Sequence, residues 1–137
     1  MIAFGPVPSR RLGRSLGINN IPSKVCSYSC VYCQVGRTHR LQMDRRFFFE
    51  PGEILRDVKI RLVQAREKSE QVDFLTFVSD GEPTLDRNLG EAIKLLKEGS
   101  TAQQLNSSTA KKHLSPFAIY NQFCYTVIAE NQYIWSK

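Results

Sequence analysis

The chain has 137 residues, of which 42% are hydrophobic and 23% are charged, and its formal net charge is +6 at pH 7. These values are typical of one globular domain and exclude a collagen-like, low-complexity or wholly disordered chain. No apolar run approaches the ~18 residues that a membrane-spanning helix needs, and no secretory signal is visible at the N-terminus. We therefore expect a cytoplasmic protein without a membrane partner, in which the four cysteines stay reduced.

The positive charge is concentrated in the first third of the chain. Residues 1–46 carry eight Lys or Arg and one acidic residue, whereas residues 47–99 carry eight bases and eleven acids. A basic surface attracts a polyanion such as RNA, and it also offsets the charge of an anionic cofactor. The charge pattern by itself leaves both interpretations open.

The first half of the chain shows a lead-in, a short strand, a cysteine loop and a helix. Residues 5–14 are rich in Pro and Gly, so we expect an extended lead-in without regular structure. Residues 15–21 have the pattern of a short strand, which Pro22 ends. After a cysteine loop over 24–37, Pro51 is suited to the first position of a helix. Apolar residues at helical spacing predict that this helix continues to about residue 69.

The next segments predict a second strand and a second helix. Residues 73–78 form an apolar run that is typical of a strand buried on both faces of a parallel sheet. A turn at 79–84 leads to a helix over 86–98, and Gly99 is a suitable stop. This alternation predicts an α/β fold with parallel strands. After residue 99 charged residues become rare, and no further βα unit is recognisable.

Three cysteines lie close together as Cys26, Cys30 and Cys33, with the spacing C-x3-C-x2-C. Three thiolates in one loop can converge on a metal centre, and a [4Fe–4S] cluster usually takes four cysteines. One iron then lacks a protein ligand, and an open position distinguishes a reactive metal site from a structural one. The alternative is a structural zinc site that His39 or Cys124 completes, although zinc loops more often use paired C-x2-C units.

With Tyr32 directly before the third cysteine, this loop resembles the hallmark of the radical S-adenosylmethionine superfamily. The resemblance implies that the three cysteines ligate a [4Fe–4S] cluster and that S-adenosylmethionine chelates the fourth iron. It also places Tyr32 beside the adenine. The implied reaction takes an electron from an external donor and cleaves S-adenosylmethionine into methionine and a 5′-deoxyadenosyl radical, which abstracts hydrogen from a substrate.

A second segment of the same kind, Asp80-Gly81-Glu82-Pro83, directly follows the strand expected over 73–78. It is similar to the Gly-Gly-Glu-Pro segment with which superfamily members contact the amino end of S-adenosylmethionine, although Asp80 replaces the first glycine. Ligands collect at the carboxyl ends of parallel strands. We therefore expect this turn to lie beside the cysteine loop and to bind the cofactor.

The resemblance implies the N-terminal portion of a radical SAM core domain over residues 1–98, which is part of an incomplete (β/α)6 barrel. It leaves 99–137 as an unassigned tail, disordered or foreign to the family. Six βα units need roughly 180 residues. We therefore expect a truncated or frame-shifted product, too short to be active alone.

Three functions remain open at this point. The lead-in and the end of the cysteine loop are similar to a subgroup placed with wyosine-type tRNA-modifying enzymes, which makes tRNA or another RNA a candidate substrate of a radical enzyme. The alternatives are a non-catalytic module that binds iron–sulfur or zinc, and a basic RNA-binding protein. The sequence does not identify the substrate, the electron donor or the oligomeric state.

Overall fold

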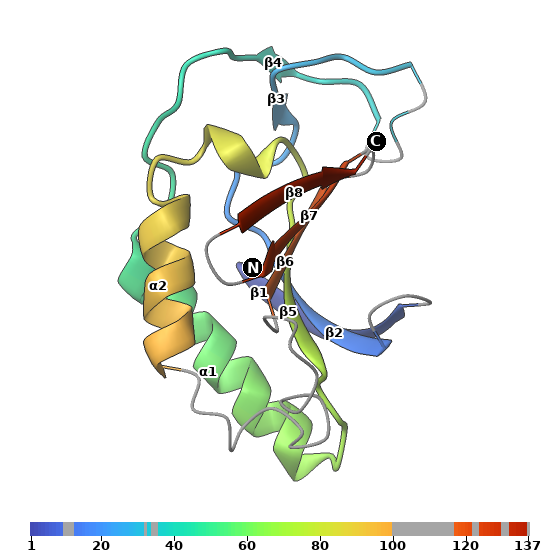
Figure 1. Ribbon diagram of the computed structural model, residues 1–137, viewed down its shortest axis with the longest axis vertical. Helices are drawn as coiled ribbons and strands as arrows, with labels where there is room; N and C mark the ends of the chain where they lie inside the picture. Colours follow the sequence, from blue (N-terminus) through green and yellow to red (C-terminus); the bar gives the residue numbers. More distant parts are fainter. Residues whose placement is uncertain are drawn as a thin grey trace.

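The computed structural model describes residues 1–9, 13–31, 33, 36–99, 117–121, 124–129 and 132–136. These residues form a six-stranded sheet of order β1-β2-β5-β6-β7-β8, a small β3-β4 sheet and two α-helices on one face of the larger sheet (Figure 1). The elements are β1 Ala3–Ser9, β2 Gly13–Ile18, β3 Val25–Cys26, β4 Arg40–Leu41, α1 Pro51–Glu67, β5 Phe74–Val78, the 3-10 helix η1 Pro83–Leu85, α2 Leu89–Gly99, β6 Phe117–Asn121, β7 Cys124–Ala129 and β8 Gln132–Ser136.

Strand β1 occupies the segment that the sequence predicts as an irregular lead-in, so that prediction is wrong. It pairs antiparallel with β2 at the edge of the sheet, and its register shifts between Phe4 and Val7. Pro6 and Pro8 fit there because an edge strand does not need every backbone N–H for the ladder.

The centre of the sheet follows the predicted α/β pattern. Strands β2, β5 and β6 are parallel neighbours. Leu75, Thr76 and Phe77 of β5 are all buried, as expected for a strand that is covered on both faces. Helix α1 begins at Pro51 as predicted, whereas α2 begins three residues later than expected because η1 and Asp86 precede it.

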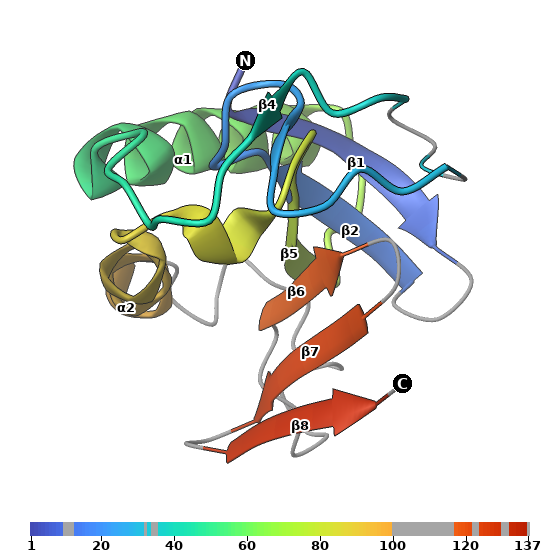
Figure 2. The same cartoon turned by 90° about the horizontal axis from the view of Figure 1, so that it is seen from above.

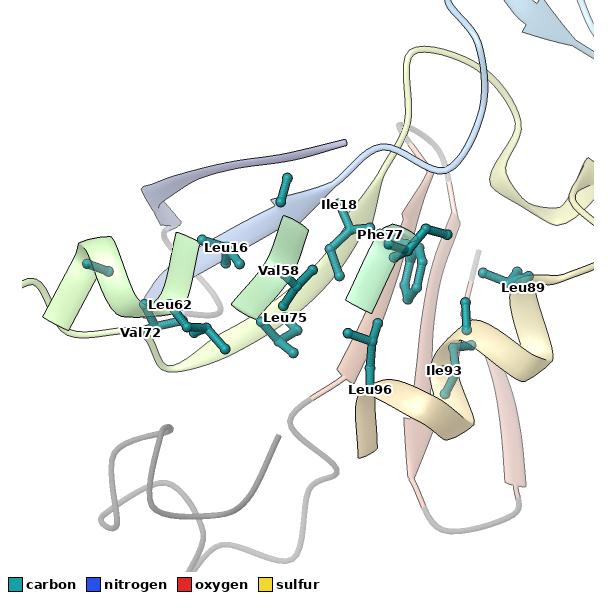
Figure 3. Close-up of a cluster of buried hydrophobic side chains, with 14 residues drawn as sticks. Leu16, Ile18, Val58, Leu62, Val72, Leu75, Phe77, Leu89, Ile93 and Leu96 are labelled. Carbon is teal, nitrogen blue, oxygen red and sulfur yellow. The ribbon is translucent and has the colours of Figure 1, made fainter. Parts of the chain in front are cut away.

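The hydrophobic core lies between this sheet and the two helices (Figure 3). Each of its large side chains stabilises the fold by about 1.5–3 kcal/mol when it is fully buried. The core comprises Leu16 and Ile18 of β2, Val58 and Leu62 of α1, Leu75 and Phe77 of β5, and Ile93 and Leu96 of α2, among others.

The prediction of an incomplete (β/α)6 barrel is wrong. The strands after β6 pair antiparallel, β7 with β6 and β8 with β7. Only two residues separate Asn121 from Cys124, and two residues separate Ala129 from Gln132. Connections this short join antiparallel strands, whereas parallel strands need a crossover of a dozen residues or more. The fold is a small α/β arrangement whose mixed sheet carries α1 and α2 on one face (Figure 2).

The described residues of the segment 99–137 thus form three strands of the sheet, although the sequence leaves this segment unassigned. The proposed boundary at residue 98 falls at the end of α2. Neither α1 nor α2 has the length and apolar character that a membrane-spanning helix requires.

Candidate functional site

The turn after β5 lies directly against the start of the cysteine loop. Lys24 donates its backbone N–H to the carbonyl oxygen of Asp80 at 2.7 Å, and Glu82 donates its N–H to the carbonyl oxygen of Val25 at 3.0 Å. Because Cys26 follows Val25, these two hydrogen bonds confirm that the turn and the cysteine loop are neighbours. Both segments follow parallel strands, β2 and β5, at their carboxyl ends.

Gly81 makes this close approach sterically possible. A Cβ atom on Gly81 would lie 2.0 Å from the carbonyl oxygen of Val25 and 3.0 Å from its carbonyl carbon. No side chain fits at such a distance unless the turn moves. The glycine of the predicted binding segment is therefore required by packing against the backbone beside Cys26.

The two ends of the cysteine loop are joined at its base. Lys24 has a φ of 62°, and its carbonyl oxygen accepts hydrogen bonds from the N–H groups of His39 and Arg40 at 3.1 and 3.2 Å. The carbonyl oxygen of Cys26 accepts from the N–H of Gln42 at 3.0 Å. Strands β3 and β4 thus hold the loop closed at the point where it meets the 80–83 turn.

The three cysteines do not form a preassembled metal cage. Cys26 is held in β3, whereas Cys30 and Cys33 belong to a separate turn in which the N–H of Cys33 donates to the carbonyl oxygen of Cys30 at 3.2 Å. All three are half-buried thiols outside any disulfide. Among the described residues no group of three or more His, Cys, Asp or Glu is placed to hold a metal ion. The assignment of the three thiols as ligands of one cluster therefore stays a prediction from the sequence. The chemistry of the donor set still suits iron and sulfide, for which thiolates are the usual ligands.

The acidic residues of the turn already have partners within the chain. The exposed carboxylate of Asp80 accepts a hydrogen bond from the side chain of Asn19 at 3.2 Å, and the Asp80 N–H donates to the same side chain at 3.3 Å. Glu82 is half-buried, and its Oε1 accepts from the N–H and hydroxyl of Thr84 at 3.2 and 2.6 Å. Pro83 is buried. Asp80 therefore fixes the turn to the end of β2, a contact that glycine cannot make.

For two other predicted site residues, the structure does not describe the side chain. Tyr32, expected beside the adenine, is not among the described residues, and neither is the side chain of Cys124. His39, the other candidate zinc ligand, is exposed in the loop.

A buried polar network beneath the turn has no counterpart in the sequence prediction. The fully buried side chain of Asn20 contacts Ser79, Pro83 and Asp86. Burial raises the pKa of Asp86, and hydrogen bonds from the Asn88 N–H and the Asn20 amide oppose this rise. In the sequence, this network is indicated only by the two asparagines, Asn19 and Asn20, that follow the apolar strand. Their role becomes visible only when the structure places the 80–83 turn beside them.

Comparisons with known proteins give relatives but no fold neighbour. The chain is 57% identical over 97 residues to UPF0026 protein MJ1312 of Methanocaldococcus jannaschii and 43% identical over 96 residues to UPF0026 protein slr1464 of Synechocystis. It is also 40% identical over 95 residues to a protein of Brachyspira hyodysenteriae named GTPase Obg. These matches cover 71%, 69% and 69% of this chain, but only 30%, 34% and 13% of the respective relatives. No model of a protein family matches, and no solved structure does.

These names correct the family assignment. The relatives are UPF0026 proteins and one GTPase, and none is named as a radical S-adenosylmethionine enzyme. The assignment to that superfamily is therefore overturned, together with the keywords that depended on it. The cysteine loop and the turn must be interpreted from their own chemistry, and the chain spans about a third or less of the length of these relatives.

Proposed function

We propose that this chain carries an iron–sulfur site at which S-adenosylmethionine is bound and reductively cleaved. The observation that supports the proposal is the pair of backbone hydrogen bonds between the 80–83 turn and residues 24–25. They bring a turn rich in carbonyl and carboxylate oxygens against a loop with three thiols. A cofactor with a cationic end and a metal-binding end suits this combination of groups.

Cys26, Cys30 and Cys33 are the proposed ligands of a [4Fe–4S] cluster, which requires the loop to draw its thiolates together. When bound, such a cluster supplies one electron from an external donor and an open iron position, so that S-adenosylmethionine gives methionine and a 5′-deoxyadenosyl radical. The ammonium group of Lys24 lies beside Gly36, three residues after Cys33, with its Nζ 3.7 Å from the position that a Cβ on Gly36 would occupy. A nearby cation favours thiolates and other anions.

The turn is the proposed site for the methionine end of the cofactor. Glu82 and the carbonyl group of Gly81 are the proposed acceptors for the N–H groups of the amino end, because the carbonyl oxygens of Asp80, Glu82 and Pro83 already accept hydrogen bonds within the chain. A hydrogen bond to a charged carboxylate is about twice as strong as a neutral one. Tyr32, next to Cys33 in the sequence, is the proposed contact for the adenine. An RNA substrate and a cytoplasmic location stay predictions from the sequence.

Anaerobic reconstitution tests this function. The full chain is incubated with iron and sulfide, analysed for iron, sulfide and zinc, and then reduced with dithionite in the presence of S-adenosylmethionine. We expect about four irons per chain and the formation of 5′-deoxyadenosine, measured by chromatography. A colourless protein that contains only zinc would contradict the proposal and favour a structural zinc module. RNA affinity that falls steeply with salt and survives loss of the cluster would favour an RNA-binding protein.

A further inference from the structure

Asn20 connects the end of β2 to both ends of the turn that follows β5. Its side chain is fully buried. Its Oδ1 accepts a hydrogen bond from the hydroxyl of Ser79 at 2.6 Å, directly before the 80–83 turn. Its Nδ2 donates to the carbonyl oxygen of Pro83 at 3.2 Å and to Oδ2 of Asp86 at 3.0 Å. One amide group therefore holds the residue directly before the turn and the last residue of the turn.

The same turn is also held at its first and third residues by the chain that follows Asn20. Lys24 and Val25 make the two backbone hydrogen bonds to Asp80 and Glu82. The segment from Asn20 to Val25 thus contacts Ser79 and three of the four residues of the turn, and then continues directly into Cys26. A change in the side chain of Asn20 releases the ends of the turn and alters its position relative to the cysteine loop.

We infer that Asn20 is a positioning residue for S-adenosylmethionine, because it fixes the turn that receives the amino end of the cofactor at a set position beside the cysteine loop. This inference rests on the proposed function. Asn20 is buried beneath the turn and acts through it. Its effect is therefore on the affinity for the cofactor, not on the capacity of the loop to bind iron.

The matched control is Asn88, another buried asparagine. Its side chain donates to the carbonyl oxygen of Phe49 at 3.1 Å, before helix α1, and this hydrogen bond leads away from the 80–83 turn. Asn20→Ala and Asn88→Ala each remove a buried amide. A general loss of stability therefore affects both variants, whereas a loss of turn position affects only Asn20→Ala.

Two measurements on the full chain decide the inference. In the metal-free chain, amide hydrogen exchange at Lys24 and Glu82 is expected to become roughly tenfold faster in Asn20→Ala and to stay unchanged in Asn88→Ala. In the reconstituted chain, a titration with S-adenosylmethionine is followed by the electron paramagnetic resonance signal of the reduced cluster. Asn20→Ala is expected to bind roughly tenfold more weakly at unchanged iron content.

The outcomes separate this inference from the proposed function. The inference is overturned if Asn20→Ala keeps wild-type exchange at Lys24 and Glu82, or if Asn88→Ala changes both measurements as much. It is also overturned if the wild-type chain binds S-adenosylmethionine and Asn20→Ala binds it equally well. If the wild-type chain does not bind S-adenosylmethionine, the proposed function is wrong. Faster amide exchange in Asn20→Ala would in that case still show that Asn20 fixes the position of the turn. Where Asn20→Ala does not fold, Ser79→Ala removes a single contact, and the same criteria apply to it.

Discussion

Replacing Gly81 by alanine tests how closely the turn is packed against the cysteine loop. The added Cβ would lie 2.0 Å from the carbonyl oxygen of Val25, and ordinary contacts begin at 3.4 Å, so the turn must move by about 1.4 Å. A shift of that size breaks the hydrogen bonds from Glu82 to Val25 and from Lys24 to Asp80. At about 1 kcal/mol for each bond and a further 1 kcal/mol or more for strain, we expect a loss of about 2–4 kcal/mol.

Thermal unfolding of the metal-free chain, followed by circular dichroism, measures this loss as a fall in Tm of roughly 10 °C. The control is Gly52→Ala in the first turn of α1, where an added Cβ meets nothing within 4 Å. Alanine is favoured over glycine in a helix, so the Tm of this control should rise slightly. A Gly81→Ala chain that unfolds within about 2 °C of the wild type would refute the reasoning.

Three further predictions concern the thiols, a buried carboxyl and a buried hydroxyl. Serine in place of Cys26, Cys30 or Cys33 should sharply lower the iron bound on reconstitution, because thiolates are the cluster ligands; wild-type iron content in all three variants would contradict a cluster. Burial raises the pKa of Asp86 above 3.8, so its contribution to stability is complete below that pH and is lost as the pH rises through the raised value. Asp86→Asn should remove this loss. The slope of the free energy of unfolding against pH, measured by urea denaturation from about pH 4 to about pH 7, should therefore differ from that of the wild type. An unchanged slope would contradict this prediction. The hydroxyl of Thr76 is buried without a hydrogen-bond partner among the described residues. Thr76→Val should therefore raise the free energy of unfolding by about 1 kcal/mol. A lower free energy of unfolding, measured by urea denaturation, would contradict this prediction.

Local patterns in the sequence were sufficient to predict the elements at the centre of the fold. Pro51 and the apolar spacing after it predicted α1 from its first residue, because Pro has no N–H to lose at that position. The apolar run at 73–78 predicted β5 and its burial on both faces. The alternation of strands and helices also predicted that β2 and β5 are parallel, and hence that the cysteine loop and the 80–83 turn are neighbours. The pattern that predicted each single element depends on residues within a few positions of one another, whereas the pairing of β2 with β5 was inferred from the order of the elements.

Only the tertiary structure decided the features that depend on distant residues. Pro6 and Pro8 oppose regular structure locally, yet pairing with β2 at the sheet edge makes their segment a strand. Asn20 and Pro83 are 63 positions apart, so no periodicity reveals that they share a hydrogen bond. The spacing of Cys26, Cys30 and Cys33 indicates their chemistry, but only the structure shows that Cys26 pairs in β3 with β4. The sequence therefore determined which groups are available, and long-range backbone hydrogen bonding determined which of them meet.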